Sequence, residues 1–276
     1  MLTDRQRDAL GALGLASVRF DAPLAPWTRL GVGGSADALV EVPDPEALAR
    51  LARWTRRERL GLTPVQRGTD AVVRDPGARG VVCLLGEAWR TELAGQGRVL
   101  GGEADALTVA TGWDAPAWLG RGGTVATALV GNDAHGATGV TAVDVVLGRG
   151  VRKTVLRAEL DLGDARLGLR DEAVVAAVHV REGEAGTLPT WDTQGVVVFR
   201  DPARGSTAAE LLAGAGLLGI RIRGARLDDV VPGRLTTEDG ATAKDVELLV
   251  DWARRQVAAE TGVELESRLR WVGARR

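Results

Sequence analysis

The sequence predicts an α+β protein with more than one subdomain. The N-terminal part shows strand and helix patterns, residues 98–180 are mostly strand-like, and the last third mixes both types. Helices and strands that gather in different parts of a chain are typical of α+β folds. The 276 residues can bury a large core and divide into two or three subdomains.

Two helices and several strands are expected before residue 98. Thr3 and Gln6 have the spacing of a capping box, which predicts a short helix that ends near residues 11–14. A strand is expected over 38–42, and Asp44 with Pro45 then starts a second helix. Residues 25–27 are expected to be loop. The buried stripe of this second helix is expected to comprise Leu48, Leu51, Ala52 and Trp54. Two further strands are expected at 72–73 and 80–85.

The middle of the chain contains a hairpin signal and a strand with a histidine. Residues 148–150 (GRG) separate two strand patterns, 143–147 and 151–156, as in a hairpin turn. His179 lies within a further strand pattern at 173–180, which predicts a structural role. The chain has one other histidine and a single cysteine, so no metal site of the His/Cys type is expected.

The C-terminal part predicts one long helix followed by a strand. Thr242 and Asp245 form a second capping-box pattern, and the helix is expected to end at Gly262. Apolar and polar residues then alternate over 263–271. This period predicts a strand with one buried face and one polar face, and Arg268 lies on the polar face.

Composition excludes several classes of partner. The net charge of −2 gives no reason to expect nucleic acid or a membrane surface, and no apolar run approaches the ~18 residues that span a bilayer. The N-terminus lacks the pattern of a signal peptide, and the single Cys83 lies in an apolar run, so we expect a cytoplasmic protein. Lysine occurs only at Lys153 and Lys244, so arginine supplies 35 − 2 = 33 basic residues, which suggests a GC-rich coding sequence as in actinomycetes.

Residues 31–36 (GVGGSA) match the dinucleotide fingerprint G-x-G-x-x-A. A Rossmann site needs a strand before this motif and a helix after it. Here a strand is expected to follow, so the motif does not predict a Rossmann site.

Four motifs in the last third together resemble one family. Residues 196–202 (VVVFRDP) resemble a Gly-Ser-x-Phe-Lys-Asn-Pro motif, and 208–216, 240–246 and 262–268 follow at matching distances. Together they resemble the UDP-N-acetylenolpyruvoylglucosamine reductase (MurB) family. The resemblance implies an α+β, FAD-binding PCMH/VAO-type module of two subdomains, followed by a MurB-type C-terminal α+β domain. We expect these three parts to cover 1–88, 89–185 and 186–276.

The flavin motifs of this family are altered here. Residues 65–70 (VQRGTD) and 123–128 (GTVATA) stand where the family has Leu-Gly-Gly-Gly-Ser-Asn and Gly-Thr-Val-Gly-Gly-Ala. Glycines in such loops let backbone N–H groups approach a diphosphate closely, and larger residues compromise that approach. We therefore expect no cofactor. If FAD is retained, the resemblance places it against Arg67, Gly68, Thr69, Thr124 and Asn132.

The resemblance also locates the family's catalytic positions. Val197 stands where the family has its proton-donating Ser, and Arg268 stands where it has its acidic Glu. Valine has no proton to donate, and the pKa of arginine lies above about 12. Arg170 matches the family's catalytic arginine, although a surface salt bridge would also account for it.

Our first hypothesis is a repurposed MurB-like enzyme, a flavin-independent cyclase or isomerase that acts on a small organic intermediate in actinomycete natural-product biosynthesis. Arginines would stabilise an anion or enolate, and Asp133 or His135 would transfer a proton. The candidate catalytic residues are Arg170, Asp133, His135, Arg200 and Asp201. The expected substrate pocket comprises Trp113, Trp118, Val197, Phe199 and Arg268, with Trp89 nearby.

Two alternatives remain open from the sequence. The chain could be a flavin-dependent oxidoreductase related to UDP-N-acetylmuramate dehydrogenase, with FAD bound in an altered geometry. It could also be a non-catalytic ligand-binding protein. Bound flavin would separate the first alternative from the leading hypothesis.

Overall fold

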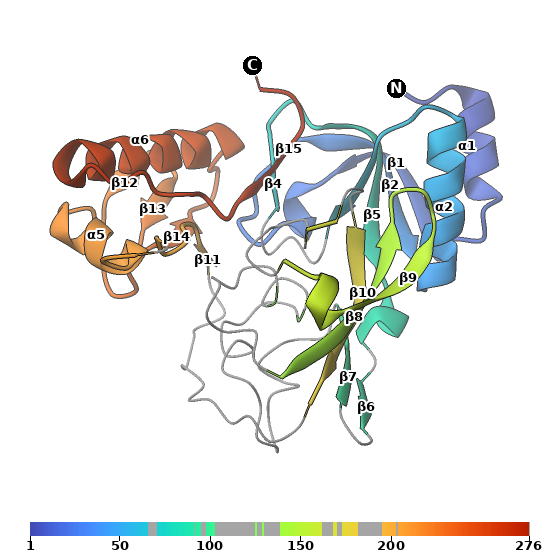
Figure 1. Cartoon of the computed structure of the whole chain (residues 1–276). Coiled ribbons are helices and arrows are strands. Elements are labelled where there is room, and N and C mark those ends of the chain that lie inside the picture. Colours follow the sequence, from blue (N-terminus) through green and yellow to red (C-terminus); the bar gives the residue numbers. More distant parts are fainter. Residues whose placement is uncertain are drawn as a thin grey trace. The chain divides into compact units, whose positions relative to one another are not determined.

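The computed structural model describes residues 1–65, 71–90, 92–94, 98–102, 125, 129, 139–161, 168–169, 173–181, 195–202 and 204–275 (Figure 1). The chain forms two compact units. The first comprises 1–22, 36–67 and 79–193, and the second comprises 23–35, 68–78 and 194–276. The mixed α+β class is confirmed. The three-part division at residues 88 and 185 stays a prediction.

The first unit begins with a four-stranded sheet and two helices. Asp44 Oδ1 accepts a hydrogen bond from Ala47 N at 2.7 Å, as expected for the N-cap of the second helix. The capping box predicted at Thr3 and Gln6 is also present. The strand order is β1 (Ser17–Pro23), β2 (Ser35–Val42), β5 (Ala78–Leu85) and β3 (Leu62–Val65), and the helices, alongside the sheet in Figure 1, are α1 (Asp4–Gly11) and α2 (Pro45–Arg57).

A five-stranded antiparallel sheet completes the described part of the first unit. The predicted hairpin is confirmed: Gly150 has φ +72° and its N–H donates to Leu147 O at 2.7 Å. His179 Nε2 lies 2.9 Å from Asp144 Oδ2, on neighbouring strands. The order is β6 (Glu92–Ala94), β7 (Arg98–Gly101), β10 (Ala173–Val180), β8 (Val140–Leu147) and β9 (Arg152–Leu156), with short 3-10 turns η2 (Glu87–Arg90) and η4 (Arg157–Glu159).

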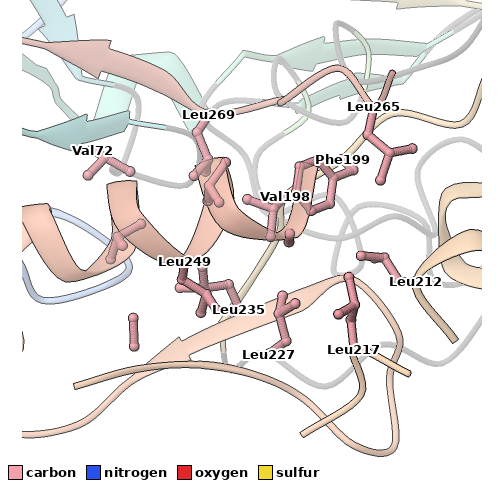
Figure 2. Close-up of a cluster of buried hydrophobic side chains, with 14 of the residues drawn as sticks. Val72, Val198, Phe199, Leu212, Leu217, Leu227, Leu235, Leu249, Leu265 and Leu269 are labelled. Carbon is pink, nitrogen blue, oxygen red and sulfur yellow. The ribbon is translucent and has the colours of Figure 1, made fainter. Parts of the chain in front are cut away.

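The second unit packs two helices on a four-stranded sheet. Its longer helix starts at the capping box predicted for Thr242 and Asp245 and ends at Gly262, which has φ 73°. The sheet order is β11 (Val196–Val197), β14 (Arg234–Thr237), β13 (Ala225–Leu227) and β12 (Arg221–Ile222), and the helices are α5 (Ala208–Gly214) and α6 (Ala243–Thr261). The buried cluster between them includes Val198, Phe199, Leu212, Leu235, Leu249 and Leu265 (Figure 2).

Two expected elements differ in the structure. Residues 263–271 do not form one strand: β15 (Arg270–Val272) pairs in parallel with β4 (Ala71–Val73), and Ser267 makes an isolated bridge to Phe199. The predicted buried positions Leu265 and Leu269 are nevertheless buried. The expected loop at 25–27 is a 3-10 turn, η1 (Ala25–Trp27).

The glycines of the 31–36 motif serve packing inside the second unit. A Cβ added to Gly34 would lie 2.3 Å from Asp75 O, and one added to Gly33 would lie 2.8 Å from Val73 O. The strand predicted after the motif is β2. These glycines therefore allow a close approach between two backbone segments.

No helix in the described part of the chain is both long enough and apolar enough to cross a membrane.

Candidate functional site

Many of the expected site residues lie outside the described ranges, and their roles stay predictions: Arg67, Gly68, Thr69, Trp113, Trp118, Thr124, Asn132, Asp133, His135 and Arg170. The others, Val197, Phe199, Arg200, Asp201 and Arg268, all belong to the second unit.

The structure brings these five residues together on two paired segments. Arg268 N donates to Val198 O at 2.7 Å, and Arg200 N donates to Glu266 O at 2.9 Å. On its other side the first segment pairs with β14, so that Val197 lies opposite Arg234. The positions that the resemblance assigns to the proton donor and the acid are therefore on neighbouring segments of one small domain.

Neither side chain at those two positions can donate a proton at neutral pH. Val196 packs against the core of the unit, so strand alternation directs the half-buried Val197 to the opposite face. Arg268 Nε donates to Phe199 O at 2.9 Å, which holds the guanidinium along the adjacent segment. A guanidinium stays charged, so this arrangement can orient a ligand or stabilise negative charge but cannot act as a general acid.

Two aromatic residues expected to line a cavity belong to cores instead. Phe199 is 2% exposed and lies in the cluster with Val198 and Leu265 (Figure 2). Trp89 is 1% exposed in the core of the first unit, and its Nε1 donates to Val42 O at 3.1 Å. Both side chains satisfy the packing of their own unit, which the sequence pattern alone did not distinguish from a pocket.

Asp201 has a structural contact at the start of α5. Its Oδ1 accepts a hydrogen bond from Ala208 N at 2.9 Å, beside the capping box made by Thr207 and Glu210. A carboxylate at this place satisfies an N–H group that the helix leaves unpaired and favours the positive end of the helix dipole. A proton-transfer role for Asp201 stays a prediction, as does anion binding by the half-buried Arg200.

The structure adds charged residues that sequence reasoning missed. Arg29 Nε donates to Gly195 O at 3.1 Å, although the two residues are far apart in the chain. Arg234 Nε and Nη2 donate to Asp228 Oδ2 at 3.1 and 2.7 Å, in a pair whose side chains are 16% and 14% exposed. The Asp-rich turn at 228–233 was the one signal in the sequence that could have indicated this pair.

The Asp228 carboxyl is held in its charged form. Burial raises its pKa, but hydrogen bonds from Val231 N, Arg234 and Val230 N outweigh burial, so that the pKa lies below its ordinary value. Asp228 therefore supplies a fixed negative charge and no proton.

Among the described residues, no group of three or more His, Cys, Asp or Glu side chains is arranged to hold a metal ion.

The sequence comparisons agree on one family. The sequence profile of the C-terminal domain of UDP-N-acetylenolpyruvoylglucosamine reductase matches residues 189–272. A UDP-N-acetylenolpyruvoylglucosamine reductase of Anaeromyxobacter sp. (strain Fw109-5) is 33% identical, over 92% of this chain and 88% of the relative. The chain belongs to the UDP-N-acetylenolpyruvoylglucosamine reductase family. A second relative in this family, from Heliobacterium modesticaldum, is 31% identical over 91% of this chain and 89% of its own length.

A solved MurB structure shows the same fold. The crystal structure of MurB from Thermus caldophilus matches 93% of this chain and 98% of its own, with a TM-score of 0.65 and 20% identity. The fold is therefore the FAD-binding PCMH type followed by a C-terminal MurB domain. The relatives are reductases, so these comparisons favour the oxidoreductase alternative over the flavin-independent cyclase or isomerase.

The motif at 66–70 that the resemblance assigns to the diphosphate lies outside the described residues, between strand β3, which ends at Val65, and β4, which begins at Ala71. A role for these residues in FAD binding stays a prediction.

Proposed function

We propose that this MurB-family protein is a flavin-dependent oxidoreductase related to UDP-N-acetylmuramate dehydrogenase, with a changed substrate. The observation that carries the oxidoreductase is the 33% identity to a reductase over 92% of the chain. The changed substrate is supported by the paired segments at 196–200 and 266–268, which carry Val197 and Arg268 where the resemblance places the family's proton-handling residues. The reaction therefore uses no side-chain proton from position 197.

The proposed cofactor residues come from the altered motifs. Thr69, Thr124 and Asn132 would donate hydrogen bonds, Gly68 would allow close approach, and Arg67 would pair with a phosphate in place of a glycine backbone contact. When bound, flavin supplies a two-electron hydride acceptor and donor.

The remaining chemistry rests on residues of the chain. Arg268 and Arg200 would hold negative charge on the substrate, because guanidinium groups bind carboxylates and phosphates through two parallel hydrogen bonds. Arg170 would polarise a substrate carboxylate, and Asp133 or His135 would transfer the proton. Alanine replacement of Arg170, and of whichever of Asp133 and His135 transfers the proton, should abolish or strongly reduce turnover while leaving bound flavin in place.

The test combines two measurements on purified protein. We expect a yellow preparation with flavin absorbance that bleaches with a nicotinamide reductant, and very slow reduction of the enolpyruvyl sugar that the relatives' name specifies. A colourless protein that fails to bind added FAD would contradict the proposal that the enzyme depends on flavin. Rapid, complete reduction of the enolpyruvyl sugar would contradict the proposal that the substrate has changed.

A second candidate function follows from the same two positions. Val197 and Arg268 remove both proton-handling groups, which suits a redox-neutral reaction in which positioning lowers the barrier. A flavin-independent cyclase or isomerase from natural-product biosynthesis would be colourless and would still consume its substrate. A non-catalytic ligand-binding protein would be unaffected in its cellular role by loss of Arg170, Asp133 and His135.

A further inference from the structure

Helix α2 of the first unit carries a basic stripe on the side away from its core. Glu46, Arg50, Arg53 and Arg57 follow one another at intervals of four, three and four residues, so they share one face of the helix. The buried residues of α2 lie on the opposite face. The stripe therefore presents three arginines and one carboxylate at the surface of the unit.

The turn between β8 and β9 lies along this stripe (Figure 1). Arg53 Nη1 donates to Gly150 O at 2.9 Å, and a Cβ added to Gly150 would lie 2.4 Å from Ala49 O. Arg152 Nη1 lies 3.7 Å from Glu46 Oε2. The turn and the start of β9 thus follow the helix from Arg53 towards Glu46.

The turn adds charge and an apolar residue to the stripe. Arg149 and Arg152 are exposed, and Val151 between them is 51% exposed. The expectation that the protein has no membrane partner rested on the net charge of −2, which averages over the whole chain and does not detect a local excess. We call the following five residues the basic surface: Arg50, Arg53, Arg57, Arg149 and Arg152.

We propose that the basic surface binds an anionic phospholipid membrane peripherally. A flat anionic surface attracts charges spread over one face, so the guanidinium groups need not converge on one point, and each can bind a lipid phosphate. Val151 would enter the headgroup region, where an apolar side chain gains from leaving water. A nucleic acid would use the same charges without burying Val151, so the apolar residue favours the membrane. The inference goes beyond the proposed function and does not depend on flavin.

The test is co-sedimentation of the full chain with vesicles of phosphatidylcholine and phosphatidylglycerol, with pure phosphatidylcholine as the neutral reference. We expect binding to the anionic vesicles that weakens as salt is raised. Replacing Arg57, Arg149 and Arg152 together by Gln should lower the partition coefficient by about a hundredfold, since each arginine near an anionic surface contributes about fivefold. Val151→Ser should lower it by about threefold, because the apolar contact is lost.

The matched control replaces Arg204, Arg221 and Arg255 by Gln, which removes the same charge from exposed positions of the second unit. It should bind like wild type, and the unfolding temperature of each variant shows whether it folds. No binding of the wild type to anionic vesicles, or an equal loss in the control, would overturn the inference. Binding to duplex DNA that is tighter than binding to vesicles and unchanged by Val151→Ser would also overturn it, in favour of a nucleic-acid surface.

Discussion

The proposed change of substrate rests on two side chains, Val197 and Arg268, in a fold that matches the family. Both residues sit in backbone hydrogen-bond patterns that any side chain could occupy. The hydrophobic core beside them, including Phe199 and Leu265, is complete. The cost of the two replacements is therefore expected in chemistry rather than in stability.

The double variant Val197→Ser with Arg268→Glu tests that expectation. The hydroxyl and carboxylate restore groups that can donate and accept a proton, so reduction of the enolpyruvyl sugar should rise by about tenfold or more, since one general acid commonly contributes 10²–10⁴ in rate. Turnover of the chain's own substrate should fall, because Arg268 no longer holds its negative charge. Steady-state kinetics measures both rates. Val197→Ala with Arg268→Gln is the control, because it changes size and charge without providing a proton donor. An equal gain in the control would contradict the explanation.

Asp228→Asn should lower stability in a pH-dependent way. The pKa of Asp228 is depressed in the fold, so its stabilisation is present above the unfolded pKa of about 3.9 and is lost as the pH falls through the folded pKa. At pH 7 the variant should lose about 1–3 kcal/mol, because Arg234 keeps its charge without its partner. Denaturant unfolding at pH 7 and pH 3 checks this, and a difference that persists unchanged at pH 3 would count against it.

Gly34→Ala should destabilise the second unit. The added Cβ would lie 2.3 Å from Asp75 O and 2.6 Å from Gly77 N, so backbone must move, at a cost of about 1–3 kcal/mol or more. Gly214→Ala, at the end of α5 with nothing within 4 Å of the added atom, should be neutral or slightly stabilising. Thermal unfolding of the two variants makes the comparison, and equal melting temperatures would show that the close approach is relieved without cost.

The helix ends were predictable from sequence, whereas the pairings between distant segments were not. The capping boxes at Thr3 and Thr242 and the N-cap at Asp44 each depend on residues within one turn, so the local sequence specifies them. The parallel pairing of β15 with β4 and the register of Val197 against Arg234 depend on tertiary packing. Arg29 and Arg234 were missed for this reason, since neither carries a local motif.

The N-cap at Thr242 is expected to stabilise helix α6. Thr242→Ala removes the acceptor for Asp245 N, so the free energy of unfolding should fall by about 1 kcal/mol. Asp75 still accepts from Ala243 N and Lys244 N, which limits the loss. Thr242→Ser keeps the acceptor and should match wild type. Denaturant unfolding measures both, and a loss in the serine variant as large as in the alanine variant would show that the hydroxyl bond is not the cause.

The whole molecule keeps a family frame while its reactive positions have changed. The similarity to reductases covers 92% of the chain, and the C-terminal profile covers residues 189–272. The replaced positions include glycines expected at the diphosphate and the two proton-handling residues, whereas caps and cores are retained. This distribution is what the proposed function, a retained fold with a changed substrate, predicts.

The absorption spectrum of freshly purified protein tests the central claim most directly. A flavin-dependent oxidoreductase should be yellow, with one FAD released per chain on denaturation. Val197 and Arg268 should not affect that stoichiometry, because neither is among the proposed cofactor residues. A colourless protein that stays colourless after incubation with excess FAD and gel filtration would contradict the claim.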